Sequence, residues 1–182
     1  MKEFLKKIGL IDRLSINLNI DKREFGHALK DNVEEGNIGW FSDFWDAFWP
    51  GKKEYKGHVG FDSFEIKRKR RFFEINTMNA TVKGRYRQDN DELVVDAEIN
   101  GFTDRMVLFL IVAISFYFFF AGIIIFSGEP PGEVLPILFP ALFIHFLFML
   151  GIPYFMARRS VKRLKYDLER ELYFLTRNRA RA

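Results

Sequence analysis

Basic side chains recur at every second position in three segments of the sequence, and this pattern could bind an anion. Alternate residues of an extended strand point to the same face, so each segment would present its cations on one side of a sheet. Such a face attracts lipid headgroups, a nucleotide or RNA. The alternative is a solvated face whose charges keep the sheet from aggregating. The candidate residues for binding an anion or a headgroup are Lys56, His58, Lys67, Lys69, Lys83, Arg85 and Arg87.

Catalytic and metal-binding patterns are absent from the sequence. The chain has no cysteine, its three histidines stand alone at positions 27, 58 and 145, and no glycine-rich phosphate loop occurs. Its Asp and Glu residues fall in predicted turns, helix caps and solvent-facing positions. The sequence therefore predicts a non-enzymatic protein with no metal and no other cofactor.

The basic residues fall on segments that the sequence predicts as antiparallel strands. Apolar and polar residues alternate in four segments between residues 54 and 100, and tight turns are predicted at Asp62–Ser63 and Asn90–Asp91. Asp96 and Glu98 on the last strand offer partial pairing to the cations. The residues expected on the inner face are Tyr55, Gly57, Val59, Phe61, Phe64, Ile66, Ala80, Val82, Gly84, Tyr86, Leu93, Val95, Ala97 and Ile99.

A strand and a helix precede this sheet. Residues 15–20 alternate polar and apolar side chains, which is typical of a half-buried strand. Asp21 and Glu24 form a capping-box pattern, and a helix with one apolar stripe is expected from there to Gly36. The soluble part therefore begins with a β–α unit.

An aromatic segment follows, and it permits two interpretations. Its rings between Phe41 and Trp49 share one face of a short predicted helix that Pro50 ends. This helix would lie in a membrane interface with its Trp rings at headgroup level, or it would close the core of the sheet. The two are evenly balanced, because Asp43 and Asp46 stand where Lys and Arg are usual. The candidate interface residues are Trp40, Phe44, Trp45, Phe48 and Trp49.

Two long apolar segments predict a transmembrane helical hairpin over residues 104–156. The first, 106–126, has 21 residues without a charge. At about 1.5 Å per residue it reaches roughly 30 Å, the thickness of the hydrocarbon core of a bilayer. The second, 134–156, contains Pro140 and Pro153, which should kink it.

The distribution of Lys and Arg predicts the orientation of this hairpin. The connecting turn has neither residue, whereas five of the nine residues after the second span are basic, and basic flanks stay in the cytoplasm. We therefore expect a multi-pass protein of the bacterial cytoplasmic (inner) membrane with both termini cytoplasmic. The expected parts are a cytoplasmic α+β domain (1–103), the hairpin, and a cytoplasmic amphipathic helix (157–182).

His145 is the intramembrane polar residue that could ionise near neutral pH. Ionisable groups inside a span are candidate relays or ligands. A neutral imidazole that bonds a helix carbonyl, Ser115 or Tyr117 is favoured, because no second polar partner stands at helical spacing. The two spans are therefore expected to act as an anchor.

The predicted fold class is α+β, an antiparallel β-meander with flanking helices joined to the transmembrane hairpin. The C-terminal helix has an apolar stripe and would pack across the sheet or against a partner helix. This order of elements is similar to a helix-grip layout, which often encloses an apolar ligand, although a fold assigns no function by itself. The stripe residues are Val161, Leu164, Leu168, Leu172 and Leu175.

Part of the chain, roughly residues 54–160, resembles a family of small bacterial two-span membrane proteins with an N-terminal α+β cytoplasmic domain. The resemblance implies the same architecture and brings no catalytic residues. The aromatic segment and Glu74-Ile75-Asn76 depart from the family pattern. The motifs that carry the likeness are Tyr55-x-Gly57, Phe64-x-Ile66-x-Arg68 and Asn79 to Gly84.

Together these features predict a membrane-tethered module that binds an anionic or apolar ligand, or a protein partner, at the inner leaflet. Anionic membrane lipid is the favoured partner, since it attracts basic residues by about 1 kcal/mol each. Nucleic acid is disfavoured, because exposed aromatics do not interleave with the cations. Homo-oligomers could form through the spans or the C-terminal helix. The alternative is a membrane-damaging effector whose spans oligomerise under control of the small β domain, similar in architecture to span-containing effectors of bacterial anti-phage systems.

Overall fold

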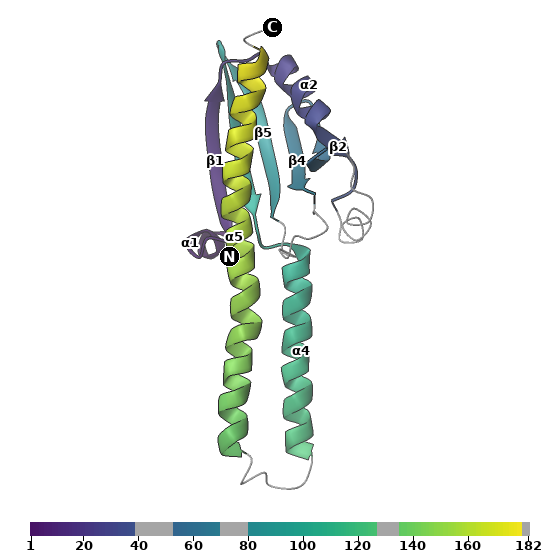
Figure 1. Cartoon of the computed structure of the whole chain (residues 1–182), viewed down its shortest axis with the longest axis vertical. Helices are drawn as coiled ribbons and strands as arrows, with labels where there is room; N and C mark the ends of the chain where they lie inside the picture. Colours follow the sequence, from purple (N-terminus) through teal and green to yellow (C-terminus); the bar gives the residue numbers. More distant parts are fainter. Residues whose placement is uncertain (39–52, 70–79, 127–134, 180–182) are drawn as a thin grey trace.

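The computed structural model describes residues 1–38, 53–69, 80–126 and 135–179. Within them the chain has two parts, a six-stranded sheet covered by helices and a pair of long helices that extend from one end of it (Figure 1). The chain is therefore a mixed α+β protein, as the sequence predicts.

Six strands form one sheet in the order β1-β6-β5-β4-β3-β2. Neighbouring strands are antiparallel, except that β2 and β3 are parallel. The first strand pairs along its whole length with the last one. The strands are β1 (Ile11–Leu18), β2 (Val33–Glu35), β3 (Tyr55–Val59), β4 (Ser63–Arg68), β5 (Thr81–Asp89) and β6 (Glu92–Asn100).

The strand pairs from β3 to β6 follow the sequence prediction. The β5–β6 hairpin turns in two residues, and Asn90 adopts a φ of 53° there. Asn tolerates this left-handed region better than most residues because its short polar side chain bonds the local backbone. The strand β2 was not predicted, since three residues are too few to display an alternation.

The helix α2 (Lys22–Asn32) begins as predicted and ends earlier. Asp21 is its N-cap, and its carboxylate accepts a 2.7 Å hydrogen bond from the Arg23 backbone N–H. Val33 leaves the helix with extended backbone and pairs with Tyr55 in β2–β3. The prediction that the helix continues to Gly36 is wrong, because the β-branched Val33 contributes to a sheet edge instead of a last helical turn.

The inner face of the sheet forms the main core, with α2 and the C-terminal half of α5 (Leu135–Arg179) packed on it (Figure 1). Every residue predicted for this face is buried except Phe61. Phe61 lies beyond the end of β3 and is 72% exposed, and the Lys22 ammonium sits 4.2 Å from the centre of its ring. A cation over an aromatic face is favourable in this partly solvated position.

A single helix of 45 residues, α5, covers both the predicted second span and the predicted separate C-terminal helix. Pro140 and Pro153 lie inside it and do not end it. The apolar stripe of its C-terminal half faces the sheet, which is one of the two arrangements that the sequence allows. Its residues Val161, Leu164, Leu168 and Leu172 are each at most 4% exposed.

The helix α4 (Asp104–Phe126) and the N-terminal half of α5 run side by side away from the sheet (Figure 1). Both are long and apolar enough to cross a membrane, and only 6% of each apolar window is buried. The core helix of a soluble protein would instead bury its apolar residues. A short helix, α1 (Lys2–Lys7), lies beside α5 where the two parts of the chain meet (Figure 1).

The close approach of β4 to Gly57 predicts that this position requires glycine. A Cβ at Gly57 would lie 2.0 Å from the Glu65 carbonyl oxygen, and that backbone is held by its own strand pairs. We expect Gly57→Ala to lower the free energy of unfolding by about 1–3 kcal/mol, the usual cost of overpacking. Chemical denaturation of the purified protein measures it. Gly60→Ala is the control, because its Cβ would meet the Ser63 carbonyl at 3.4 Å; equal losses in both variants would contradict the prediction.

Candidate recognition surface

The outer face of the sheet, opposite α2 and α5, holds most of the side chains that the sequence singles out. Strand register determines which charges become neighbours on it. Lys83 of β5 lies opposite Glu65 of β4 on one side and Glu98 of β6 on the other. Arg85 lies opposite Asp96. Lys83 and Arg85 therefore each face an acid on a neighbouring strand, whereas Arg87 lies opposite Val94.

The charges of this face alternate in sign from strand to strand, which differs from the predominantly basic face that the sequence predicts. Lys83 Nζ is 2.9 Å from Glu65 Oε1, and a guanidinium nitrogen of Arg13 on β1 is 3.7 Å from Glu98 Oε2. Exposed pairs of this kind contribute only about 0–1 kcal/mol each to stability. Their main effect is to make the outer face mixed in charge.

An open depression of about 1300 Å³ lies over this face. Its lining includes four Lys or Arg, four Asp or Glu, and His58, drawn from five strands and the β3–β4 turn. A surface of both signs complements a partner that carries both signs, and it discriminates against a partner of one sign. The Lys, Arg, Asp and Glu residues of the lining are Arg13, Lys83, Arg85, Arg87, Asp62, Glu65, Asp96 and Glu98.

The depression brings together four of the seven predicted anion-binding residues. Lys83, Arg85, Arg87 and His58 line it. His58 Nδ1 is 3.5 Å from Glu35 Oε1, and both side chains are well exposed. Lys56 points to the same face from β3 but is half-buried and does not line the depression.

Lys67 and Lys69 are buried, which corrects the prediction that they belong to an exposed basic face. Lys67 is 2% exposed, and its Nζ donates a 3.0 Å hydrogen bond to the Ile38 carbonyl. Lys69 is 9% exposed and pairs with Glu34 of β2. A buried ammonium persists only with such partners. They come from β2 and the residues after it, which the sequence pattern did not reveal.

Tyr117 of α4 and His145 of α5 join the two long helices. The Tyr117 hydroxyl lies 2.8 Å from His145 Nδ1, and the imidazole also packs near Phe116, with ring centres 6.1 Å apart. This contact corresponds to the interhelical hydrogen bond that the sequence favours over a relay or a ligand. One polar bond between otherwise apolar helices fixes their relative rotation.

The candidate interface residues Trp40, Phe44, Trp45, Phe48 and Trp49 lie outside the described residues. Within the described part of the chain, no group of three His, Cys, Asp or Glu is arranged to hold a metal ion.

Two tyrosines in the core stay neutral in the folded protein. Burial raises the pKa of Tyr55, and the carboxylates of Glu171 and Asp167 raise it further. Burial also raises the pKa of Tyr86, whose hydroxyl donates a 2.7 Å hydrogen bond to the Gly60 carbonyl. Ionisation of either ring would place a charge at a low-dielectric site.

The fold and the surface define a class of protein, an α+β domain with a mixed-charge depression and two long apolar helices. Comparisons of the chain with protein-family models, curated proteins and solved structures find no match. Functional inference therefore rests on the geometry of the chain itself.

The raised pKa of Tyr55 predicts a loss of stability in alkali. In the unfolded chain a tyrosine releases its proton near pH 10, about its unperturbed pKa, whereas folded Tyr55 retains it. From about pH 10 up to the folded pKa, the unfolded state binds fewer protons, so the free energy of unfolding falls as pH rises. We expect Tyr55→Phe to make this fall shallower, as followed by denaturation monitored by near-UV circular dichroism. Tyr166→Phe, at a ring that is 65% exposed, should leave it unchanged; an equally steep fall without Tyr55 would refute the prediction.

Proposed function

We propose that this chain is a membrane-anchored, non-enzymatic recognition module whose mixed-charge depression binds a protein partner. The observation that carries the anchoring is the division of α5 into two unlike halves. Its N-terminal half is apolar and exposed, and its C-terminal half is buried in the core of the domain. Exposed apolar surface costs about 25 cal/mol per Å² in water, so hydrocarbon is the environment that fits the first half.

The proposed location is the bacterial cytoplasmic (inner) membrane, with both termini in the cytoplasm. Support comes from the basic residues that follow the apolar half of α5, beginning at Arg158 and Arg159. Such residues stay on the cytoplasmic side during insertion. The same orientation places the sheet and the depression in the cytoplasm.

The direction of the strands favours a protein partner over a lipid surface for the depression. The strands run alongside the C-terminal half of α5, so the outer face stands upright relative to the long helices (Figure 1). A face that stands along the membrane normal does not lie flat on headgroups. Its mixed charges also suit a polypeptide, which offers both signs, better than phosphate alone.

We further propose that the domain has a helix-grip-like architecture. The first strand pairs with the last, and a long helix crosses the same sheet, which supports the likeness. Helix-grip proteins often hold an apolar ligand between that helix and the sheet. Here the four leucine and valine side chains of the α5 stripe are at most 4% exposed, so the open outer depression is the better-supported site.

Labelling from one side of the membrane tests the anchoring and the orientation. Because the chain has no cysteine, single substitutions Phe61→Cys and Glu129→Cys each introduce one reactive thiol. In intact bacterial spheroplasts, we expect a membrane-impermeant maleimide to label position 129, which lies between the two apolar segments in the sequence. Position 61, in the domain, should react only after the membrane is permeabilised. The reverse pattern would invert the proposed topology, and release of the protein by alkaline carbonate would contradict the anchoring.

Site-specific photo-crosslinking in cells tests the depression. A photoreactive amino acid at Ser15, beside Asp96 on the outer face, should give one polypeptide adduct of defined mass. Arg85→Glu should abolish this adduct by removing the charge complementarity. The same probe at Tyr166, exposed on α5, is the matched control. Identical adducts at both positions, or an adduct that survives Arg85→Glu, would contradict recognition by the depression.

A second candidate function is the membrane-damaging effector, which the surface of the long helices favours. A Cβ at Gly122 or Gly151 would have nothing within 4 Å, so another helix could approach closely at either position. Because α5 is continuous, a movement of the domain would be transmitted along this helix to the spans. If this function holds, overexpression should permeabilise cells, and Gly151→Leu should abolish the damage while the protein still inserts. Harmless expression at high level would rule it out.

A further inference from the structure

The end of the domain nearest the long helices has a small core of its own. It joins α1 to both α4 and α5, and partly buried hydrophobic residues pack against it. The Tyr154 hydroxyl also donates a 2.8 Å hydrogen bond to the Ile8 carbonyl just after α1. The short helix is therefore fixed in place. The buried residues of this second core are Leu5, Leu10, Ile11, Met106 and Ala157.

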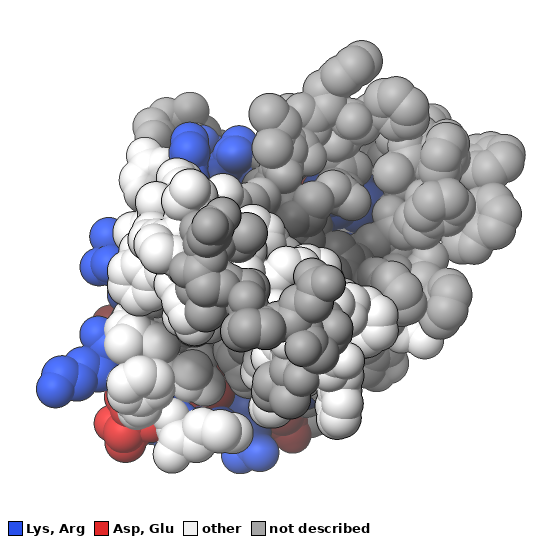
Figure 2. All heavy atoms as spheres, turned by 90° about the horizontal axis from the view of Figure 1, so that it is seen from below, with Lys and Arg blue, Asp and Glu red and all other residues white. Residues whose placement is uncertain are grey.

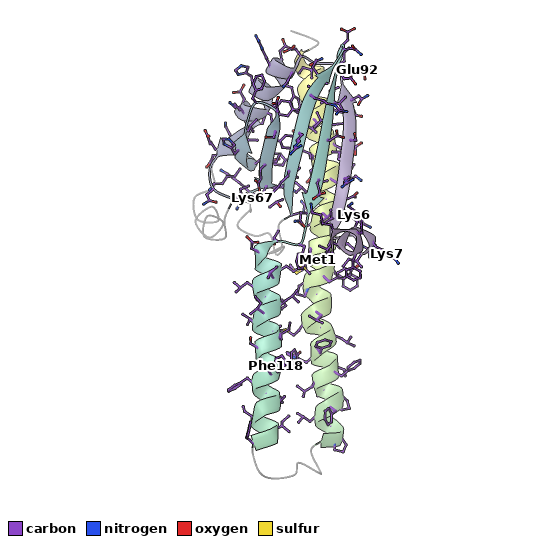
Figure 3. All side chains as sticks on the ribbon, turned by 180° about the vertical axis from the view of Figure 1, so that it is seen from behind. Met1, Lys6, Lys7, Lys67, Glu92 and Phe118 are labelled. Carbon is purple, nitrogen blue, oxygen red and sulfur yellow. The ribbon has the colours of Figure 1, made fainter. Side chains whose placement is uncertain are left out.

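α1 carries exposed apolar side chains at the level where the long helices leave the domain. Phe4 is 62% exposed and Met1 is 93% exposed. In both ribbon views α1 lies level with the start of α4, and Figure 3 shows Met1 on the side of the long helices and Lys6 on the side of the sheet. A short helix that exposes apolar and basic side chains together at such a boundary is typical of a membrane interface.

Basic residues gather at the same level. Lys7 of α1 and Arg159 and Lys162 of α5 are exposed, and the described residues provide none of them with an ion pair. No Asp or Glu occurs in α5 between Leu135 and Tyr166. Seen from below, along the long helices, Lys and Arg side chains appear at several points around them, with Asp and Glu side chains beside those at the lower edge (Figure 2). This charge complements an anionic surface that lies across the helix axis.

Arg158 lies between these two features. Its Nε is buried and, among the described residues, is one of two such side-chain atoms without a hydrogen-bond partner. One terminal nitrogen makes only a 3.5 Å contact with the Tyr154 hydroxyl. Gly9, with φ +75°, leaves room for the side chain, since a Cβ there would be 3.1 Å from Nε. Among the described residues the guanidinium is therefore positioned but has few acceptors, and the oxygens of a phosphodiester match its fork of donors.

We infer that α1 lies in the headgroup layer of the inner leaflet and that Arg158 binds the phosphodiester of an anionic phospholipid. Phe4 enters the boundary of the acyl chains, and Lys7, Arg159 and Lys162 contact neighbouring headgroups. This inference rests on the proposed membrane anchoring, and it moves the lipid contact from the outer sheet face to the base of the domain. A second copy of the chain fits less well, because its own surface at this level would be equally basic.

Spin labels at three positions test the depth of α1. The full chain, with a nitroxide on Phe4→Cys, Phe118→Cys or Phe61→Cys, is placed in vesicles of phosphatidylcholine and phosphatidylglycerol. Collision rates with oxygen and with a water-soluble nickel chelate report depth. Phe118, in the middle of α4 (Figure 3), should be deep, Phe61 should be in water, and Phe4 should lie between them. If Phe118 is in water, the proposed anchoring fails; if only Phe4 matches Phe61, this inference alone fails.

Native mass spectrometry of the full-length protein tests the phosphodiester site. With equal amounts of phosphatidylglycerol and phosphatidylcholine added, we expect the protein to retain phosphatidylglycerol severalfold more often. Arg158→Gln should remove that preference, whereas Lys83→Gln, at the outer face, should keep it. Added inorganic phosphate should not displace the lipid. The inference would be overturned by an unchanged preference in Arg158→Gln or by displacement of the lipid by free phosphate. In the spin-label experiment, spin–spin broadening at Phe4 from a second copy would also overturn it.

Discussion

The packing of the C-terminal half of α5 on the sheet is the interaction on which the rest of the structure depends. Leu168 and Leu172 lie within a core shared by the sheet and α2. Truncation of one such leucine typically costs about 2–5 kcal/mol, a large share of the roughly 5–15 kcal/mol that keeps a domain folded. Because the same helix continues into the exposed apolar half, the sheet cannot turn relative to the long helices unless α5 bends or this stripe separates from it.

The local periodicity of the sequence was enough to predict the inner face of the sheet. Thirteen residues expected there are buried, and Phe61 alone departs because β3 ends two residues before it. The start of α2 could also be predicted, because the Asp21 cap is a local signal that acts over one helical turn. The end of α2 could not be predicted, because Val33 pairs with Tyr55 across a parallel strand pair. Such pairing joins distant segments and leaves no periodic signal.

The sequence predicted which side chains lie on the outer face, but it did not predict that this face is mixed in charge. Strand alternation correctly placed Lys83 and Arg85 on the outer face, but it could not show that Glu65 would stand beside Lys83. Register depends on which strands pair and where they turn. The charge that lies beside a given residue on the adjacent strand is therefore set by the tertiary structure. The burial of Lys67 has the same origin, since its partner Ile38 belongs to another segment.

Two connections between the domain and the long helices restrict different motions. Continuity of α5 fixes the direction of the strands relative to the helix axis, while the buried cluster that includes Leu5, Met106 and Ala157 joins α1 to both long helices. A single helical tether would still permit the domain to lean, because long helices bend gently at small cost. The second contact lies to one side of α5 and opposes that leaning. In a membrane, the outer depression would then remain at a constant height and face sideways, where a neighbouring protein can reach it and headgroups cannot cover it.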